Sequence, residues 1–131
     1  MEAAQRYLEA KERYPAGSEE WAEATARTFN SLGQNECAEV ATPEWWNDEG
    51  LKALSARVVR AAPSAATAAT MRAVVLSGAG AGTWEAGPRS AAEFKEAAAC
   101  FDRSAALSSA PAVKAQKTRL AELCRGRAED M

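Results

Sequence analysis

Four arginines are the residues of this sequence whose type and spacing point to a binding site. Arg57 and Arg60 fall on one expected helix, and Arg72 follows on the next helix after a short turn. Arg103 comes one repeat later, close to the spacing described below. Guanidinium groups bind carboxylates through two parallel hydrogen bonds and do so against apolar surfaces. If the expected helices stack, these arginines form one basic band that would bind an acidic peptide or partner helix.

Two adjacent tryptophans, Trp45 and Trp46, are the second candidate for partner binding. Adjacent residues of a helix point about 100° apart, so both rings cannot face the same core. One of them is expected in the core, and the other either packs on a neighbouring unit or anchors a partner. Large aromatic side chains dominate the binding energy of many protein interfaces.

The chemistry needed for catalysis is largely missing. The chain has no histidine, which removes the imidazole-based nucleophile systems and most catalytic zinc sites. Cys37, Cys100 and Cys124 form no C-x-x-C pair, and the last two fall on apolar helix faces as small core residues. Paired carboxylates fall on expected solvent faces or helix N-termini. We therefore expect no catalytic residue, no metal and no cofactor, and a protein that is not an enzyme.

A glycine-rich stretch from Gly78 to Arg89 provides an alternative function. It follows a valine-rich run and resembles a dinucleotide-binding turn, in which glycines let backbone amides approach a pyrophosphate. The G-x-G-x-x-G spacing requires glycine where Thr83 stands, and no acidic residue is placed to hold a ribose. A connection between two helices is the favoured interpretation, and a small-molecule or nucleotide site in residues 78–89 is the alternative.

The composition favours an all-α domain that positions these residues. Alanine, the best helix former, supplies 33 of 131 residues, and isoleucine is absent. Apolar periodicity, N-caps, prolines and glycines predict six helices, over about 2–14, 18–33, 42–62, 64–78, 90 to beyond 105, and 111–126. Thr42, Ser64 and Ser90 are the expected N-caps of the third, fourth and fifth helices. In the sixth, Val113, Leu120, Leu123 and Cys124 are expected to face inward, and Gly126 to end the helix.

The landmarks recur at a fixed spacing. Pro15, Pro63 and Pro111 are each 48 residues apart, and the caps Thr42 and Ser90 share that spacing. This pattern is typical of a repeated helix–turn–helix unit. We expect a single domain, 1–131, of three units at about 1–41, 42–89 and 90–131, arranged as a short solenoid or a compact bundle.

Two resemblances agree with this prediction. The segments EFKEAAACFDRSAALSSAP and AVKAQKTRLAEL resemble tetratricopeptide-type repeats, with Phe94, Ala97 and Phe101 at the aromatic and small positions of the second helix. The resemblance implies a scaffold whose inner groove holds a peptide or helix. The segments TPEWWNDEGLKALSARVVRAAP, MRAVVLSG and WEAGPRSAAEFKEAA resemble a multi-copy helical family of eukaryotic algae, which adds no chemistry.

The charge distribution is asymmetric. Residues 1–50 hold 4 Lys/Arg against 11 Asp/Glu, whereas residues 51–131 hold 12 against 7. Such blocks predict attraction to an acidic partner, or self-association through the opposed halves as an alternative structural role. A pI near 5.3 argues against nucleic-acid binding. With no apolar run long enough for a membrane span and a charged N-terminus, a soluble, intracellular protein in cytoplasm or organelle stroma is expected.

Overall fold

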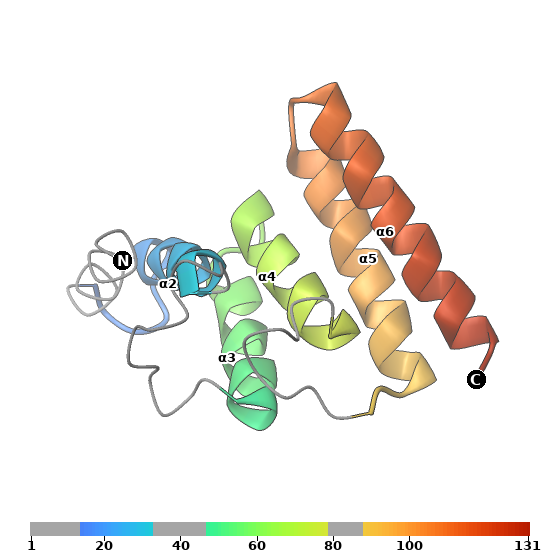
Figure 1. Ribbon diagram of the computed structural model, residues 1–131. Coiled ribbons are helices and arrows are strands. Elements are labelled where there is room, and N and C mark those ends of the chain that lie inside the picture. Colours follow the sequence, from blue (N-terminus) through green and yellow to red (C-terminus); the bar gives the residue numbers. More distant parts are fainter. Residues whose placement is uncertain (1–13, 33–46, 79–87) are drawn as a thin grey trace.

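The computed structural model describes residues 14–32, 47–78 and 88–131 (Figure 1). Within these ranges the chain forms five helices and no strand, which confirms the all-α prediction. The helices are α2 (Glu19–Leu32), α3 (Asp48–Ala61), α4 (Ala66–Ser77), α5 (Ala91–Leu107) and α6 (Pro111–Glu129). Residues 2–13 of the expected first helix lie outside the described residues, so a sixth helix stays a prediction.

α2 begins where the sequence predicts. The Ser18 hydroxyl accepts a hydrogen bond from the Trp21 amide at 3.1 Å, and Glu19 and Glu20 lie in the first turn, where the helix dipole favours acids. Trp21, Thr25 and Phe29 are buried along one stripe. The Thr25 hydroxyl, which would otherwise be an unsatisfied buried donor, bonds to the Trp21 carbonyl at 2.7 Å.

α3 begins later than predicted. Its N-cap is Asn47, whose side chain accepts a hydrogen bond from the Gly50 amide at 2.8 Å. Asn47 has an extended backbone, so one continuous helix from Thr42 to Ala62 is wrong. The physical reason is that asparagine caps at least as well as threonine, and Asp48 and Glu49 supply the first-turn acids. Thr42 itself lies outside the described residues.

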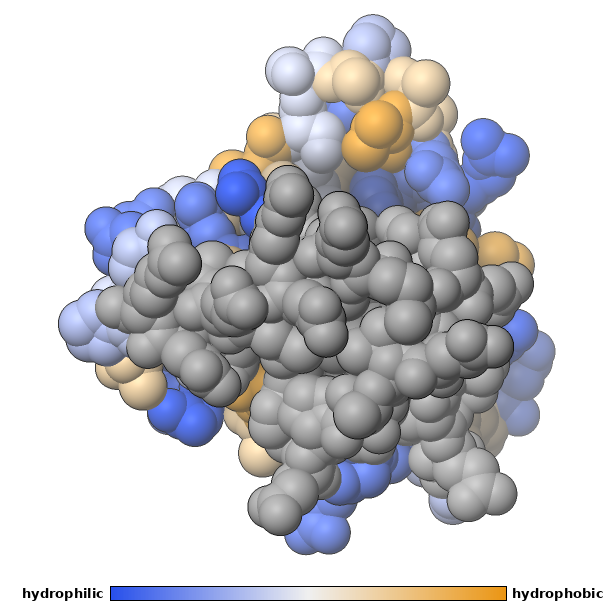
Figure 2. All heavy atoms as spheres, turned by 60° about the vertical axis from the view of Figure 1, so that its left-hand side comes forward, coloured by the Kyte–Doolittle hydropathy of each residue, from blue (hydrophilic) through white to orange (hydrophobic). Residues whose placement is uncertain are grey.

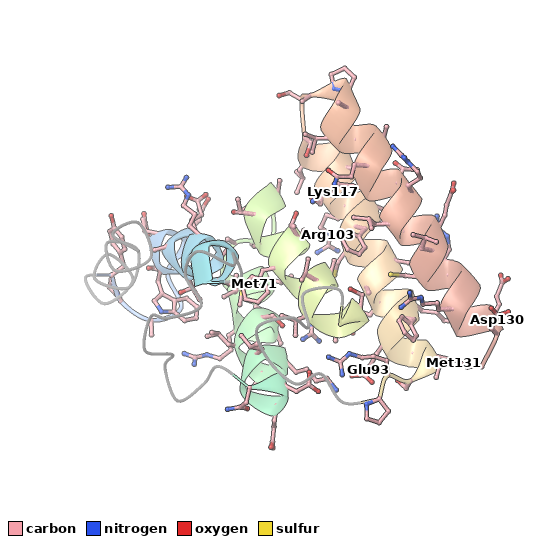
Figure 3. The ribbon with its side chains drawn as sticks, viewed as in Figure 1. Met71, Glu93, Arg103, Lys117, Asp130 and Met131 are labelled. Carbon is pink, nitrogen blue, oxygen red and sulfur yellow. The ribbon has the colours of Figure 1, made fainter. Side chains whose placement is uncertain are left out.

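α4 is apolar on two faces and lies between two hydrophobic clusters. Ala68, Met71 and Val75 pack with residues of α2 and α3, and Met71 points from α4 toward α2 (Figure 3). Ala73 and Leu76 pack instead with residues of α5 and α6. The prediction that Ser64 caps α4 is wrong: Ala65 is the N-cap and provides no side-chain hydrogen bond. Gly78 ends the helix with a left-handed backbone, φ 71°.

α5 and α6 form an antiparallel hairpin. The predicted capping box is confirmed, with the Ser90 hydroxyl and the Glu93 side chain each bonding to the other residue's amide. Phe94 and Phe101 are buried between the helices. Pro111 opens α6 as predicted, at the first turn.

Two predictions about α6 are wrong. The helix passes through Gly126 to Glu129, because an exposed helical glycine costs too little to end a helix packed against α5. Val113 and Leu123 face solvent, and the buried stripe is Ala121, Cys124 and Ala128. Alanine on this stripe lets α6 approach α5 closely. Leu107, the last residue of α5, is exposed. Hydrophobic atoms also gather at the top of Figure 2, the end of the molecule where Figure 1 shows the turn between α5 and α6.

The helices are arranged as a row. α3, α4, α5 and α6 each contact the next in sequence, and α2 crosses against both α3 and α4 (Figure 1). Among the described helices, α3 and α5 do not pack extensively on each other, so both flank α4. This arrangement opens a concave surface over α4.

Candidate partner-binding groove

The concavity over α4 is a groove of about 300 Å³ between α3 and α5. Its lining combines small or apolar residues with three arginines and one glutamate. The residues are Ala56, Val59 and Arg60 of α3, Arg72 of α4, and Glu96, Ala99, Cys100 and Arg103 of α5. Three of the four arginines predicted to gather therefore line one groove.

Arg72 is the most buried of these charges and is held at the groove by α3. Its Nη1 donates to the Lys52 carbonyl at 2.7 Å and to the Ser55 hydroxyl at 3.0 Å. Its Nε donates to Glu96 Oε2 of α5 at 2.9 Å. The Arg72 side chain is 14% exposed, whereas that of Glu96 is 52% exposed. These bonds join three helices and give the guanidinium a fixed orientation.

Arg60 and Arg103 lie on opposite walls of the groove. Both are exposed, and within the described residues neither forms a hydrogen bond or an ion pair. Figure 3 shows Arg103 between α4 and α5. With Arg72 and Glu96 paired, these two guanidinium groups give the groove an excess of positive charge beside the apolar residues of its walls.

Arg57 does not belong to this groove. Its guanidinium lies over the ring of buried Trp21, 5.1 Å from the ring centroid, in cation–π geometry. Arg57 lies one turn before Arg60 and about 60° further around α3, on the side that packs against α2. Trp45 and Trp46 lie outside the described residues, so their part in partner binding stays a prediction.

A salt-bridge network sets the position of α5 relative to α3. Arg89, which is 8% exposed, donates from Nη1 to Asp48 Oδ2 at 3.0 Å and from Nη2 to the Val75 carbonyl at 3.0 Å. Lys52 Nζ lies 2.6 Å from Glu93 Oε2. These contacts connect the N-termini of α3 and α5 and satisfy a carbonyl at the end of α4. They fix the separation of the two groove walls.

Sequence reasoning missed Glu96 and Arg89. Arg89 was included only in the glycine-rich stretch 78–89, of which residues 79–87 lie outside the described residues. Charge in the sequence gives no signal for either role, because the partners Arg72 and Asp48 are 24 and 41 residues away. Only the packing of α3, α4 and α5 brings Glu96 to Arg72 and Arg89 to Asp48.

Burial and neighbouring groups shift the pKa values of Cys100, Cys124 and Glu93. Burial raises the pKa of the Cys100 thiol, and the negative charge of Glu96 acts in the same direction. Burial likewise raises the pKa of the Cys124 thiol. Both thiols are buried, as predicted. The hydrogen bond from Lys52, followed by that from the Ser90 amide, lowers the pKa of Glu93.

The described residues contain no group of three or more Cys, Asp or Glu placed to hold a metal ion. No helix in the described ranges has both the length and the apolar character needed to cross a bilayer.

Comparison of the chain with protein-family models, with curated proteins and with solved structures found no match. The tetratricopeptide-like and algal-family resemblances are therefore left as expectations.

Proposed function

We propose that the protein is a non-catalytic interaction module that binds an acidic peptide segment of a partner protein in the groove over α4. The observation that carries the proposal is the grouping of Arg60, Arg72 and Arg103 in one groove, whose walls also present the apolar residues Ala56, Val59 and Ala99. A carboxylate side chain would pair with the arginines, while the aliphatic part of the segment would cover the apolar residues of the walls. Because α3 and α5 are joined by the Arg89 network, the groove exists before the ligand binds, which lowers the entropic cost of association.

The direct test compares two fluorescent peptides. In the first, alanine and glutamate alternate; in the second, every glutamate is replaced by glutamine. We expect fluorescence anisotropy to show binding of the glutamate peptide and none of the glutamine peptide at the same concentration. Binding should weaken from low to physiological salt, because the contacts lie near the surface.

Two matched double variants distinguish binding in the groove from a general effect of the protein's net charge. Arg60→Ala/Arg103→Ala removes two groove cations and should weaken binding by about tenfold, which corresponds to two partly exposed ion pairs. Lys114→Ala/Arg119→Ala removes two exposed cations of α6 and changes the net charge equally. Equal loss in both variants, or no dependence on salt, would exclude the groove as the binding site.

A further inference from the structure

Arg72 lines the groove, and one edge of its guanidinium is only partly used by bonds within the protein. The opposite side is fixed, because Nη1 donates to the Lys52 carbonyl and to the Ser55 hydroxyl. Nε bonds to Glu96, and within the described residues no hydrogen bond reaches Nη2. Nε and Nη2 lie along the same edge, the one that can bind both oxygens of a carboxylate.

Glu96 uses only half of this edge. One of its oxygens accepts from Nε, and the pair is exposed mainly through Glu96, whose side chain is 52% exposed. Because the Arg72 side chain is only 14% exposed, Glu96 can leave it at small cost only when another carboxylate takes its place. Arg72 would keep its orientation, since its two bonds to α3 do not involve Glu96.

We infer that Glu96 is an internal competitor for the ligand, and that a carboxylate of the acidic segment displaces it to bind Arg72 through both Nε and Nη2. This inference rests on the proposed function and adds its recognition mode. Arg60 and Arg103 line the same groove and attract the incoming carboxylate. The module therefore selects segments whose carboxylate binds Arg72 better than Glu96 does, and weakly acidic segments are rejected.

The test compares two isosteric substitutions on α5 with the same glutamate peptide. Glu96→Gln removes the competing charge. We expect the affinity of this variant for the glutamate peptide to rise by about three- to tenfold, the effect of losing one partly exposed ion pair. Asp102→Asn is the control: Asp102 pairs with Arg125 at 2.7 Å on the exposed side of the hairpin, and its change in net charge is the same. We expect it to raise the affinity far less.

A third variant tests the bidentate contact. Arg72→Lys/Glu96→Gln retains the positive charge but offers no two-nitrogen edge, so the gain of Glu96→Gln should disappear. Circular dichroism would verify that each variant folds.

The outcomes distinguish this inference from the proposed function. A wild-type protein that binds the peptide, with no gain in Glu96→Gln or an equal gain in Asp102→Asn, overturns the inference and leaves the proposed function standing. A gain that persists in Arg72→Lys/Glu96→Gln overturns the bidentate mode. If neither wild type nor Glu96→Gln binds, both proposals are overturned. Binding seen only in Glu96→Gln supports the inference.

Discussion

Glu93 connects two parts of the molecule through one carboxylate. It closes the capping box of α5 by accepting from the Ser90 amide at 2.9 Å, and it pairs with Lys52 of α3. The sequence predicted the first role, because a capping box is a local pattern of four residues. The second role depends on how α5 lies against α3, which no local pattern encodes.

The acid stability of the protein should depend on Glu93. Its pKa is lowered in the folded state, chiefly by the Lys52 hydrogen bond, so its contribution is present above the unfolded glutamate pKa of about 4.3. That contribution is lost as the pH falls through the lower, folded-state value. Wild type should therefore lose more unfolding free energy between neutral pH and about pH 3 than Glu93→Gln, which has no charge to titrate there.

Urea unfolding at a series of pH values measures this difference. Glutamine can still accept from the Ser90 amide, so the substitution preserves the cap and removes mainly the charge. Parallel pH curves for the two proteins would show that the Lys52–Glu93 pair does not contribute to folding.

Among the elements, α5 was predicted best and α6 worst. Phe94, Ala97 and Phe101 place the buried face of α5 unambiguously, because large apolar residues alternate with charged ones. In α6, Val113 and Leu123 were predicted to face inward because they are large apolar residues. Packing against α5 instead buried Ala121 and Ala128, because close helix approach favours small residues there.

The two glycines with opposite backbone geometry provide an element-level test. Gly126 lies inside α6, and a Cβ added there meets nothing within 4 Å. Gly126→Ala should stabilise the protein by about 0.5–1 kcal/mol, the usual helix-propensity gain. Gly17 precedes α2 with φ +92°, a conformation that L side chains rarely adopt, so Gly17→Ala should destabilise it.

Thermal or urea unfolding of the two variants decides between a continuous α6 and one that ends at Gly126. If α6 ended at Gly126, as the sequence predicted, alanine there would replace a favourable C-cap and lower stability. A loss of stability in Gly126→Ala would thus contradict the helix beyond this residue.

At the level of the whole molecule, the sequence predicted the fold class and part of the groove. Helical periodicity is local and strong. The arginine band was predicted from the repeat spacing between Arg57 and Arg103, of which only Arg103 lines the groove, together with Arg60 and Arg72. The sequence could not exclude Arg57, because an angle of about 60° around α3 separates Arg60 in the groove from Arg57 over Trp21. The arrangement in three units of 48 residues stays a prediction, since the first helix and two connections lie outside the described residues.

The two hydrophobic clusters share α4, and this sharing should make unfolding cooperative. Met71 belongs to the cluster with α2 and α3, is 1% exposed, and lies five residues from Leu76 of the other cluster. Met71→Ala should lower the unfolding free energy by about 2–5 kcal/mol through the cavity it leaves. Because α4 cannot detach from one cluster without weakening the other, amide hydrogen exchange should accelerate in α5 as well as in α2 and α3. Phe101→Ala, in the second cluster, should produce the reciprocal effect on α2. Acceleration confined to the helices of the substituted cluster would show instead that the molecule unfolds as two independent halves and that α4 does not couple them.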